Sequence, residues 1–258
     1  MVEIIIKPNL FQLHSLKTRV TLFTLVIFVI GIWLLSYYAG RTLLKDMQQE
    51  LGQQQLATTS LLAAQINDGF SERLAALEII AAGINADNLQ DASSIQALLE
   101  NRPILLRYFN AGVYVTRVDG IAMLSVPASI ARIGVDYSDR DYIATPLKLG
   151  KSAIGRPVIG KVLNSPVFGI GMPIKDSNGV VIGVLAGVTD LGKPSFLDKV
   201  IESRYGKSGY FLLQHPQDRL IILSTDKRRI MQPQSAPGLN PFIDRQLQGA
   251  EETGITKN

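Results

Sequence analysis

Three side chains in the middle of the chain have the types and spacing to hold a small polar ligand. Arg140 and Tyr142 stand two residues apart in a polar loop, and Asp190 ends an apolar, β-rich run. An arginine guanidinium presents a fork of donors that matches a carboxylate, and an aspartate facing the same pocket accepts from an ammonium or a hydroxyl. The pattern therefore predicts a binding pocket for a small carboxylate or amine.

The loop that carries the arginine also has a plain structural interpretation. It reads DYSDRDY from residue 136, so Tyr137 and Asp139 belong to the same candidate site. In the alternative, Arg140 pairs with Asp139 or Asp141 on the protein surface, an exposed contact worth about 0–1 kcal/mol. Both interpretations stay open at the level of the loop alone.

Residues suited to acid–base or covalent chemistry are scarce. His14 precedes a long apolar segment, and His215 lies in a turn beside a proline. The sequence has no Gly-x-Ser-x-Gly elbow, phosphate loop or His-Glu-x-x-His helix, and GRPVIG at 155–160 lacks the lysine of a phosphate loop. Glu251 and Glu252 stand in a polar tail. We expect no enzyme activity, no cofactor and no metal site in this chain.

Composition narrows the class of protein further. The chain has 258 residues, 47% of them hydrophobic, which is enough for a membrane segment and one or two modules with their own cores. The net charge of +4 is small, and the basic cluster at 227–229 fits a solvated turn, so we expect no nucleic-acid partner. The absence of cysteine excludes disulfides, thiolate metal sites and a lipid anchor on cysteine.

Val20 to Ala39 is a run of about twenty residues without a charge, long enough to cross a bilayer as a helix. Trp33, Tyr37 and Tyr38 crowd its end, where aromatic rings favour the membrane interface. A cleaved signal peptide is the rival, but the run exceeds the usual signal core and a helical pattern continues after it. A buried core helix is the other alternative. We expect an uncleaved anchor.

The segment after the anchor has helical periodicity. Apolar residues recur at spacings of three and four, at positions 44, 47, 51, 66, 70, 74, 77, 81 and 84. This predicts a long helix from residue 41 to 88. In one interpretation this helix packs only on its own domain. In the other it also pairs with the same helix of a second copy in a homodimer, and the pattern fits both.

Downstream, the period changes from 3.6 to 2. Two strand pairs are predicted, at 113–125 around an Asp-Gly turn and at 166–189 around Ser-Asn-Gly, and a short helix over 95–106 is interrupted at Pro103. A similar hairpin returns at 209–224, which suggests two related modules of antiparallel sheet flanked by helices. The second lacks a counterpart of the 166–189 pair, so we expect it to be incomplete.

These motifs, in this order, resemble the Cache sensors, the extracytoplasmic ligand-binding modules of bacterial receptors. The resemblance rests on DYSDRDY, on ATP at 144–146, on IGRP at 154–157, on the glycine-punctuated strands and on Asp190. It implies that Arg140 holds a ligand carboxylate, that the aromatic Tyr142 assists and that Asp190 takes an amine. Amino-acid-binding members have Arg-x-Trp-Tyr, whereas here Tyr142 and Ile143 fill the aromatic positions, so the ligand is expected to be a small carboxylate or another amine.

The resemblance implies an α+β double Cache receptor with PAS-like modules in the periplasm and an anchor in the bacterial inner membrane. The expected parts are a cytoplasmic tail (1–19), a transmembrane helix (20–40), a stalk helix (41–88), a membrane-distal module (89–195) and a truncated membrane-proximal module (196–258). The expected output, beyond this chain, is a diguanylate cyclase or a histidine kinase, with a chemotaxis output as the weaker choice. The alternative function is a single-pass envelope scaffold without a small-molecule ligand.

Overall fold

The computed structural model describes residues 16–86, 89, 91–198 and 211–250. The chain divides into two units, one up to Gln55 and one from Leu56 onward. Helix α1 runs from Leu16 to Ala82 and includes the uncharged segment from Val20 to Ala39. Its length and composition would allow it to cross a membrane, and the side chains of its apolar segment are exposed.

The segment expected to be a stalk is continuous with the apolar segment in a single helix, which ends at Ala82 rather than at the expected residue 88. Gly83 follows, and its amide donates to the Ile80 carbonyl at 3.0 Å in a tightened last turn. Residues 87 and 88 lie outside the described part of the chain.

Two short helices replace the single one expected over 95–106. Helix α3 covers Ala92–Glu100, and α4 covers Pro103–Tyr108. Pro103 occupies the first turn of α4, where its missing N–H costs nothing, whereas in the middle of a helix it would break a hydrogen bond. The proline therefore starts a new helix. Asp91 caps α3 by accepting from the Ser93 amide at 3.1 Å.

The main sheet contains six strands in the order β2-β1-β6-β5-β3, with β4 also paired to β5, and all pairings are antiparallel. The longest pair is β5 (Pro166–Lys175) with β6 (Val181–Asp190). The other strands are β1 (Val113–Thr116), β2 (Ala122–Val126), β3 (Ala153–Ile154) and β4 (Val158–Ile159).

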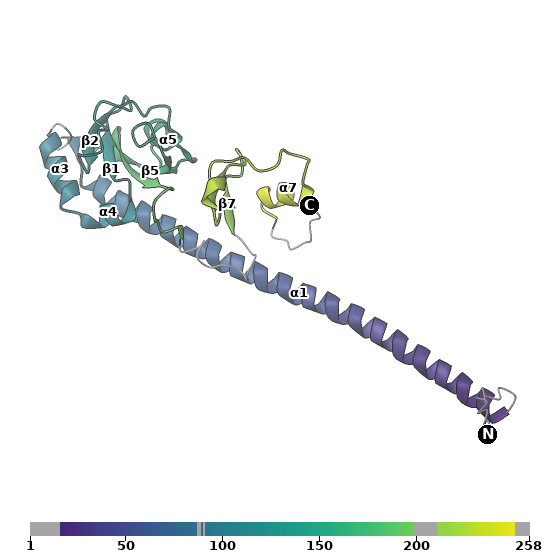
Figure 1. The fold of residues 1–258 in the computed structure, drawn as a ribbon. Helices are drawn as coiled ribbons and strands as arrows, with labels where there is room; N and C mark the ends of the chain where they lie inside the picture. Colours follow the sequence, from purple (N-terminus) through teal and green to yellow (C-terminus); the bar gives the residue numbers. More distant parts are fainter. Residues whose placement is uncertain (1–15, 87–88, 90, 199–210, 251–258) are drawn as a thin grey trace, which may run out of the picture. The chain divides into compact units, whose positions relative to one another are not determined.

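Each face of this sheet has its own apolar cluster, because alternate strand residues point to opposite sides. One face packs on the C-terminal part of α1 and on α3 and α4, through residues such as Leu77, Leu99, Phe168 and Leu185. The other is covered by helix α5 (Asp141–Leu149) and by Tyr137, over Val167, Ala186 and Val188. Figure 1 shows α5 on one side of the strands and α3 and α4 on the other.

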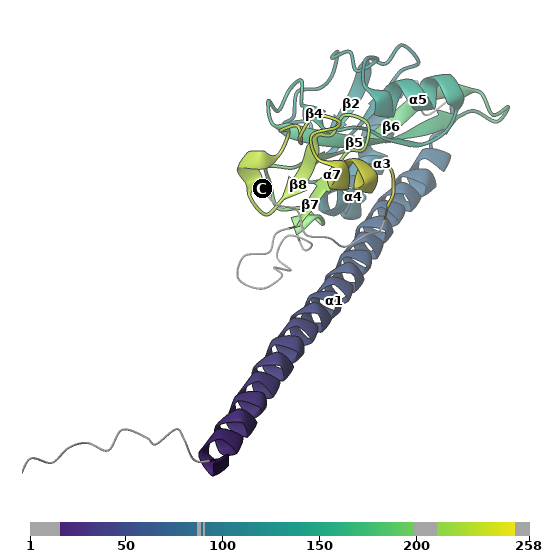
Figure 2. The same cartoon turned by 90° about the vertical axis from the view of Figure 1, so that its right-hand side faces the viewer.

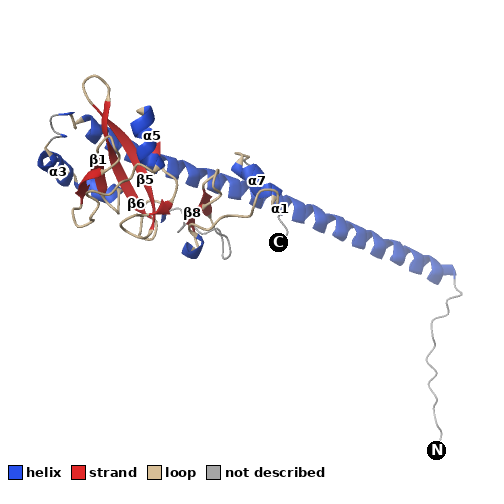
Figure 3. Cartoon of the chain, turned by 90° about the horizontal axis from the view of Figure 1, so that it is seen from above, coloured by secondary structure: helices blue, strands red, loops and turns tan. Residues whose placement is uncertain are grey.

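The second hairpin forms a separate sheet, as predicted, from β7 (Leu212–Gln214) and β8 (Ile221–Ser224). Figure 2 labels both strands and Figure 3 labels β8, and neither strand is hydrogen-bonded to the six-stranded sheet. A 3-10 turn (Lys227–Arg229) and helix α7 (Pro241–Leu247) follow. The expected start of this hairpin at residues 209 and 210, the tail at 1–15 and the end at 251–258 lie outside the described residues.

Candidate ligand-binding site

Helix α5 brings the candidate residues onto the sheet, and two glycines of β5 allow it to approach. A Cβ on Gly169 would overlap the Tyr142 ring, and one on Gly171 would overlap the Tyr142 carbonyl oxygen. Pro146 lies inside α5 and has no N–H to offer to that carbonyl four residues earlier. The helix therefore rests with its Tyr142 backbone against a strand that has no side chains at the contact.

The prediction of a polar loop that contains both Arg140 and Tyr142 is wrong for Tyr142. Arg140 is the extended residue that precedes α5, whereas Tyr142 lies in the first helical turn. Asp141 favours that turn because a carboxylate is stabilised at a helix N-terminus. Gly150 ends the helix in the left-handed conformation, with φ of 61°.

A small cavity of about 10 Å³ lies between α5, the sheet and the turn after β4. This is room for about one water molecule. Its polar lining consists of aromatic and cationic side chains: Tyr114, Arg132, Tyr137, Arg140, Tyr142 and Lys161. Val167 and Val188, from the two long strands, form its apolar floor. No carboxylate belongs to this lining.

Three tyrosines meet in the cavity. The Tyr114 hydroxyl donates to the Tyr142 hydroxyl at 3.2 Å, and the ring centroids of Tyr114 and Tyr137 are 4.7 Å apart. Burial raises the pKa of all three phenols above their usual value, and most strongly that of Tyr114. They therefore stay protonated at neutral pH and supply hydroxyl groups that can donate to a ligand.

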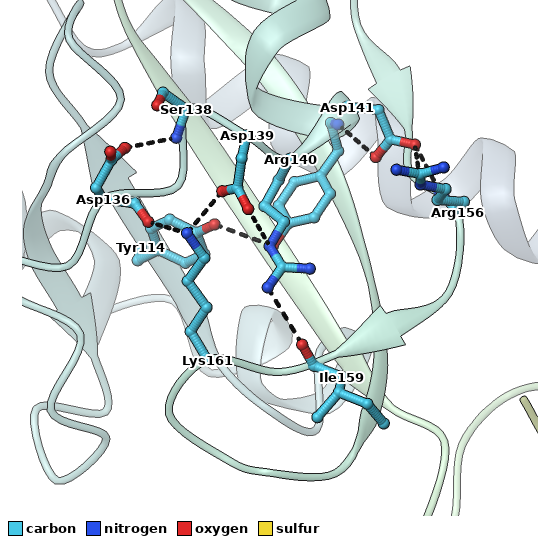
Figure 4. A network of polar contacts seen from close by, with 10 residues as sticks. Tyr114, Asp136, Ser138, Asp139, Arg140, Asp141, Arg156, Ile159 and Lys161 are labelled. Atoms are coloured by element: carbon cyan, nitrogen blue, oxygen red, sulfur yellow. Dashed lines mark hydrogen bonds and ion pairs between the residues drawn. The ribbon is translucent and has the colours of Figure 1, made fainter.

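Arg140 lies mostly buried beside this cluster, with its side chain 15% exposed. Its Nη2 donates to the Ile159 carbonyl on β4 at 3.3 Å, and its Nε lies 3.6 Å from an Asp139 carboxylate oxygen (Figure 4). The second contact is the surface pair that the structural interpretation expected, but it is long and Asp139 is 57% exposed. Asp141 pairs instead with Arg156, at 3.9 Å.

Lys161 is the cavity-lining residue that contacts the loop before α5. Its Nζ donates to an Asp139 carboxylate oxygen and to the Asp136 carbonyl, both at 2.6 Å (Figure 4). These bonds tie the turn between β4 and β5 to the loop before α5. Asp139 therefore lies at the rim as a partner of Lys161, and Tyr137, Arg140 and Tyr142 line the cavity itself.

Asp190 is placed differently from the expectation that it lines the same cavity. It is the last residue of β6 and pairs with Val167, so its side chain is on the cavity face of the sheet. It is 4% exposed, its Oδ1 accepts from the Gly192 amide at 2.9 Å, and its Oδ2 lies 3.9 Å from Lys193 Nζ. Asp190 is not among the residues that line the cavity.

Sequence reasoning missed Arg132 and Tyr114. Arg132 is 2% exposed, its Nη2 donates to the Ala111 carbonyl at 2.6 Å and its Nη1 to the Ser125 hydroxyl at 3.4 Å. Its position between Ala131 and Ile133, an arginine among apolar neighbours, was the available signal. Tyr114 could have been found from strand alternation, because it faces away from Val113 and Val115.

The site does not have the character of a metal centre. Among the described residues, no group of three histidine, cysteine, aspartate or glutamate side chains lies close enough to hold a metal ion. The donors that meet in the cavity are guanidinium, ammonium and phenol groups. These groups are suited to an anion and do not favour a cation.

Comparisons with known proteins place this geometry in a family. The family model described as a Cache domain, of the double Cache type, matches residues 44–258. A comparison with curated protein sequences found no match.

Several solved structures share the fold. The ligand-binding domain of the Pseudomonas fluorescens chemoreceptor CtaA, solved with L-serine, is 22% identical with a TM-score of 0.57, over 75% of this chain and 77% of that one. That of Pseudomonas aeruginosa PctB, solved with L-Arg, is 22% identical with a TM-score of 0.59, over 71% and 69%. The sensor domain of the V. cholerae histidine kinase DctB is 13% identical with a TM-score of 0.58, over 78% of each chain.

The family match covers most of the chain, and it includes both sheets and the cavity under α5. Domains of this kind are non-catalytic modules that sense small molecules in chemoreceptors and histidine kinases. The chain therefore belongs to the Cache domain family, as a double Cache sensor domain with an apolar N-terminal helix.

Proposed function

We propose that this chain is the extracytoplasmic sensory input region of a bacterial membrane receptor and that its first module binds a small carboxylate. The observation that carries the proposal is the meeting of the Arg140 guanidinium with three phenol hydroxyls in one cavity whose lining has no carboxylate. A guanidinium and neutral hydroxyls in a desolvated site are suited to a carboxylate.

Each residue has a role in this proposal. Arg140 exchanges its 3.3 Å bond to a backbone carbonyl for a charge-assisted bond to the ligand, which is worth about 1.5–3 kcal/mol. Tyr137 and Tyr142 donate their hydroxyls. Asp190, at the strand end on the same face, takes an ammonium or hydroxyl group of a ligand long enough to reach it.

The small volume of the cavity implies that binding is coupled to movement. A cavity of about 10 Å³ is too small for any carboxylate, so a ligand must displace the turn between β4 and β5. Lys161 holds that turn, and the contact of Arg140 with Ile159 holds the end of β4 just before it. A ligand that recruits Arg140 would loosen the second of these contacts. Ligand binding thus shifts the population of two arrangements of this turn.

We also propose the surroundings of the module. The segment from Val20 to Ala39 anchors the chain in the inner membrane with the sensor in the periplasm, and the stalk helix pairs with a second copy of the chain. The signal then passes to a cytoplasmic diguanylate cyclase or histidine kinase. Sequencing the gene past codon 258 tests the output directly, since either domain would have to follow a second membrane segment.

A ligand screen by thermal shift, on the whole chain in detergent, tests the binding proposal against the scaffold alternative. A carboxylate at about 100 times its Kd should add about 2.7 kcal/mol to the free energy of unfolding. A scaffold without a small-molecule ligand would respond to no carboxylate and no amine.

The variant Arg140→Ala should abolish the stabilisation by ligand and leave the unliganded melting temperature nearly unchanged, because the present partners of Arg140 are weak. Arg117→Ala is the matched control, since Arg117 is half exposed, pairs with Asp119 and is not part of the cavity lining. If Arg140→Ala unfolded the domain while binding per folded molecule persisted, Arg140 would be structural and the pocket would lie elsewhere.

A further inference from the structure

The cavity contains more positive charge than one carboxylate requires. Its lining includes three cationic side chains, Arg132, Arg140 and Lys161, and no acidic one. Asp139 at the rim serves both Lys161, at 2.6 Å, and Arg140, at 3.6 Å. The Asp136 carboxylate also feels the charge of Lys161. Lys161 therefore has acidic partners of its own, whereas the only ion pair of the two guanidinium groups among the described residues is the 3.6 Å contact of Arg140 with Asp139.

Arg132 is the more deeply placed of the two guanidinium groups. It is 2% exposed, and its partners are the Ala111 carbonyl, the Ser125 hydroxyl, the Tyr137 side chain and the face of the Tyr114 ring, whose centroid lies 5.4 Å from its Cζ. Every one of these partners is uncharged. Among the described residues, no carboxylate lies within ion-pair distance of Arg132.

A buried charge without a counter-ion is costly, and arginine stays protonated at neutral pH. Asp190, at the end of β6 on the same sheet face, accepts from the Gly192 amide and lies near Lys193, and it forms no ion pair with Arg132. Tyr137 is hydrogen-bonded with Arg132 and feels the charge of both guanidinium groups. Arg132 and Arg140 thus line the same cavity as this phenol.

We propose that Arg132 is a specificity-determining residue of this pocket, which selects a small dicarboxylate by binding its second carboxylate while Arg140 binds the first. The inference rests on the proposed function and deepens it by naming the class of ligand. A dianion would give each of the two guanidinium groups a carboxylate partner, and arginine forks match carboxylates in geometry. A monocarboxylate would leave one guanidinium without a charged partner.

Isothermal titration of the whole chain in detergent tests this with pairs of ligands of equal size. Succinate, malonate and glutarate are each compared with the corresponding monoamide, which keeps the shape and loses one charge. For one or more of these pairs, the wild-type protein should bind the dicarboxylate about tenfold more tightly than the monoamide. The monoamide complex lacks the second charge-assisted hydrogen bond. Aspartate and glutamate in the same series show whether an added amine, for Asp190, increases affinity.

Arg132→Gln removes the charge and keeps hydrogen-bond donors. It should reduce the ratio of dicarboxylate to monoamide affinity to about one and leave monoamide binding through Arg140 nearly unchanged, whereas Arg117→Gln should retain the wild-type ratio. If Arg132 only braces the Ala111 backbone, the variant lowers the unliganded melting temperature and the ratio persists, which overturns the proposal.

The wild-type ligand series decides the question even if Arg132→Gln does not fold. Equal affinity for a dicarboxylate and its monoamide would refute the inference and leave the proposed carboxylate sensor intact. No response to any carboxylate, with one charge or two, would instead refute the proposed function itself.

Discussion

At the scale of single residues, the buried phenols determine how the site responds to pH. Burial raises the folded-state pKa of Tyr114, Tyr137 and Tyr142 above the ordinary value of 10.0. A group whose pKa is higher in the folded state binds its proton more tightly there. Its contribution to stability is fully present below the unfolded pKa and is lost as the pH rises above it.

We therefore expect the free energy of unfolding to fall as the pH rises above about 10. In Tyr114→Phe, this fall should be less steep, because one of the titrating groups is gone, and stability at neutral pH should drop by about 1 kcal/mol with the lost hydroxyl bond. Urea unfolding at a series of alkaline pH values measures both effects. Tyr108→Phe, outside the cavity, is the control, and an unchanged slope in Tyr114→Phe would contradict the expectation.

At the scale of elements, the site depends on how closely α5 rests on β5. The contact has Gly171 on the strand and the Tyr142 carbonyl on the helix, and it leaves no space for a side chain. The same approach brings the Tyr142 ring over Gly169 and its hydroxyl to Tyr114. The cavity thus exists because two glycines alternate with Phe168 and Ile170 along one strand.

Gly171→Ala should consequently displace α5 and destabilise the module by about 1–3 kcal/mol, the range for overpacked cores. Chemical denaturation measures the loss. Gly83→Ala is the control, because a Cβ there would meet only the Ile80 carbonyl oxygen, at 3.4 Å, and it should be nearly neutral. A stable Gly171→Ala protein with unaltered ligand binding would show that α5 is seated by other contacts.

At the scale of the whole molecule, the proposed membrane anchor would decide where the sensor works. The segment from Val20 to Ala39 is uncharged and helical, with Trp33 stacked on Tyr37 and the Arg41 guanidinium over the Tyr37 ring at its C-terminal end. Aromatic and basic side chains at such a position favour the interface of a bilayer. Lys7, Lys17 and Arg19 precede the segment, whereas only Arg41 and Lys45 follow it closely. From this small excess of basic residues on the N-terminal side we expect a cytoplasmic N-terminus and an exported sensor.

Alkaline phosphatase fused after residue 100 should be active and should fractionate with the membrane. The same fusion with Val26 and Val29 both changed to Arg provides the control, since two charges in the apolar core disfavour insertion. An inactive fusion, or a soluble product cut near Ala39, would exclude an uncleaved anchor.

The sequence by itself determined the elements whose signal is local. An uncharged run and a 3.6-residue period are enough for α1, and Asp-Gly and Asn-Gly turns between alternating strands are enough for the hairpins at 113–126 and 166–190. Arg140 and Tyr142 could be selected because the guanidinium and the ring stand two residues apart. The order of the motifs along the chain predicted that both residues belong to the first module.

Only the tertiary structure decided which groups meet. Arg132 and Tyr114 come from a loop and a strand remote from the DYSDRDY motif, and they reach the cavity because the sheet face and α5 enclose them together. Strand alternation could give the face on which Asp190 lies but not its distance from the cavity along β6. The run of polar residues around Arg140 favoured a loop at Tyr142, where a helix forms. The sequence could not show this helix because α5 packs on two glycines that lie more than twenty residues away in the chain.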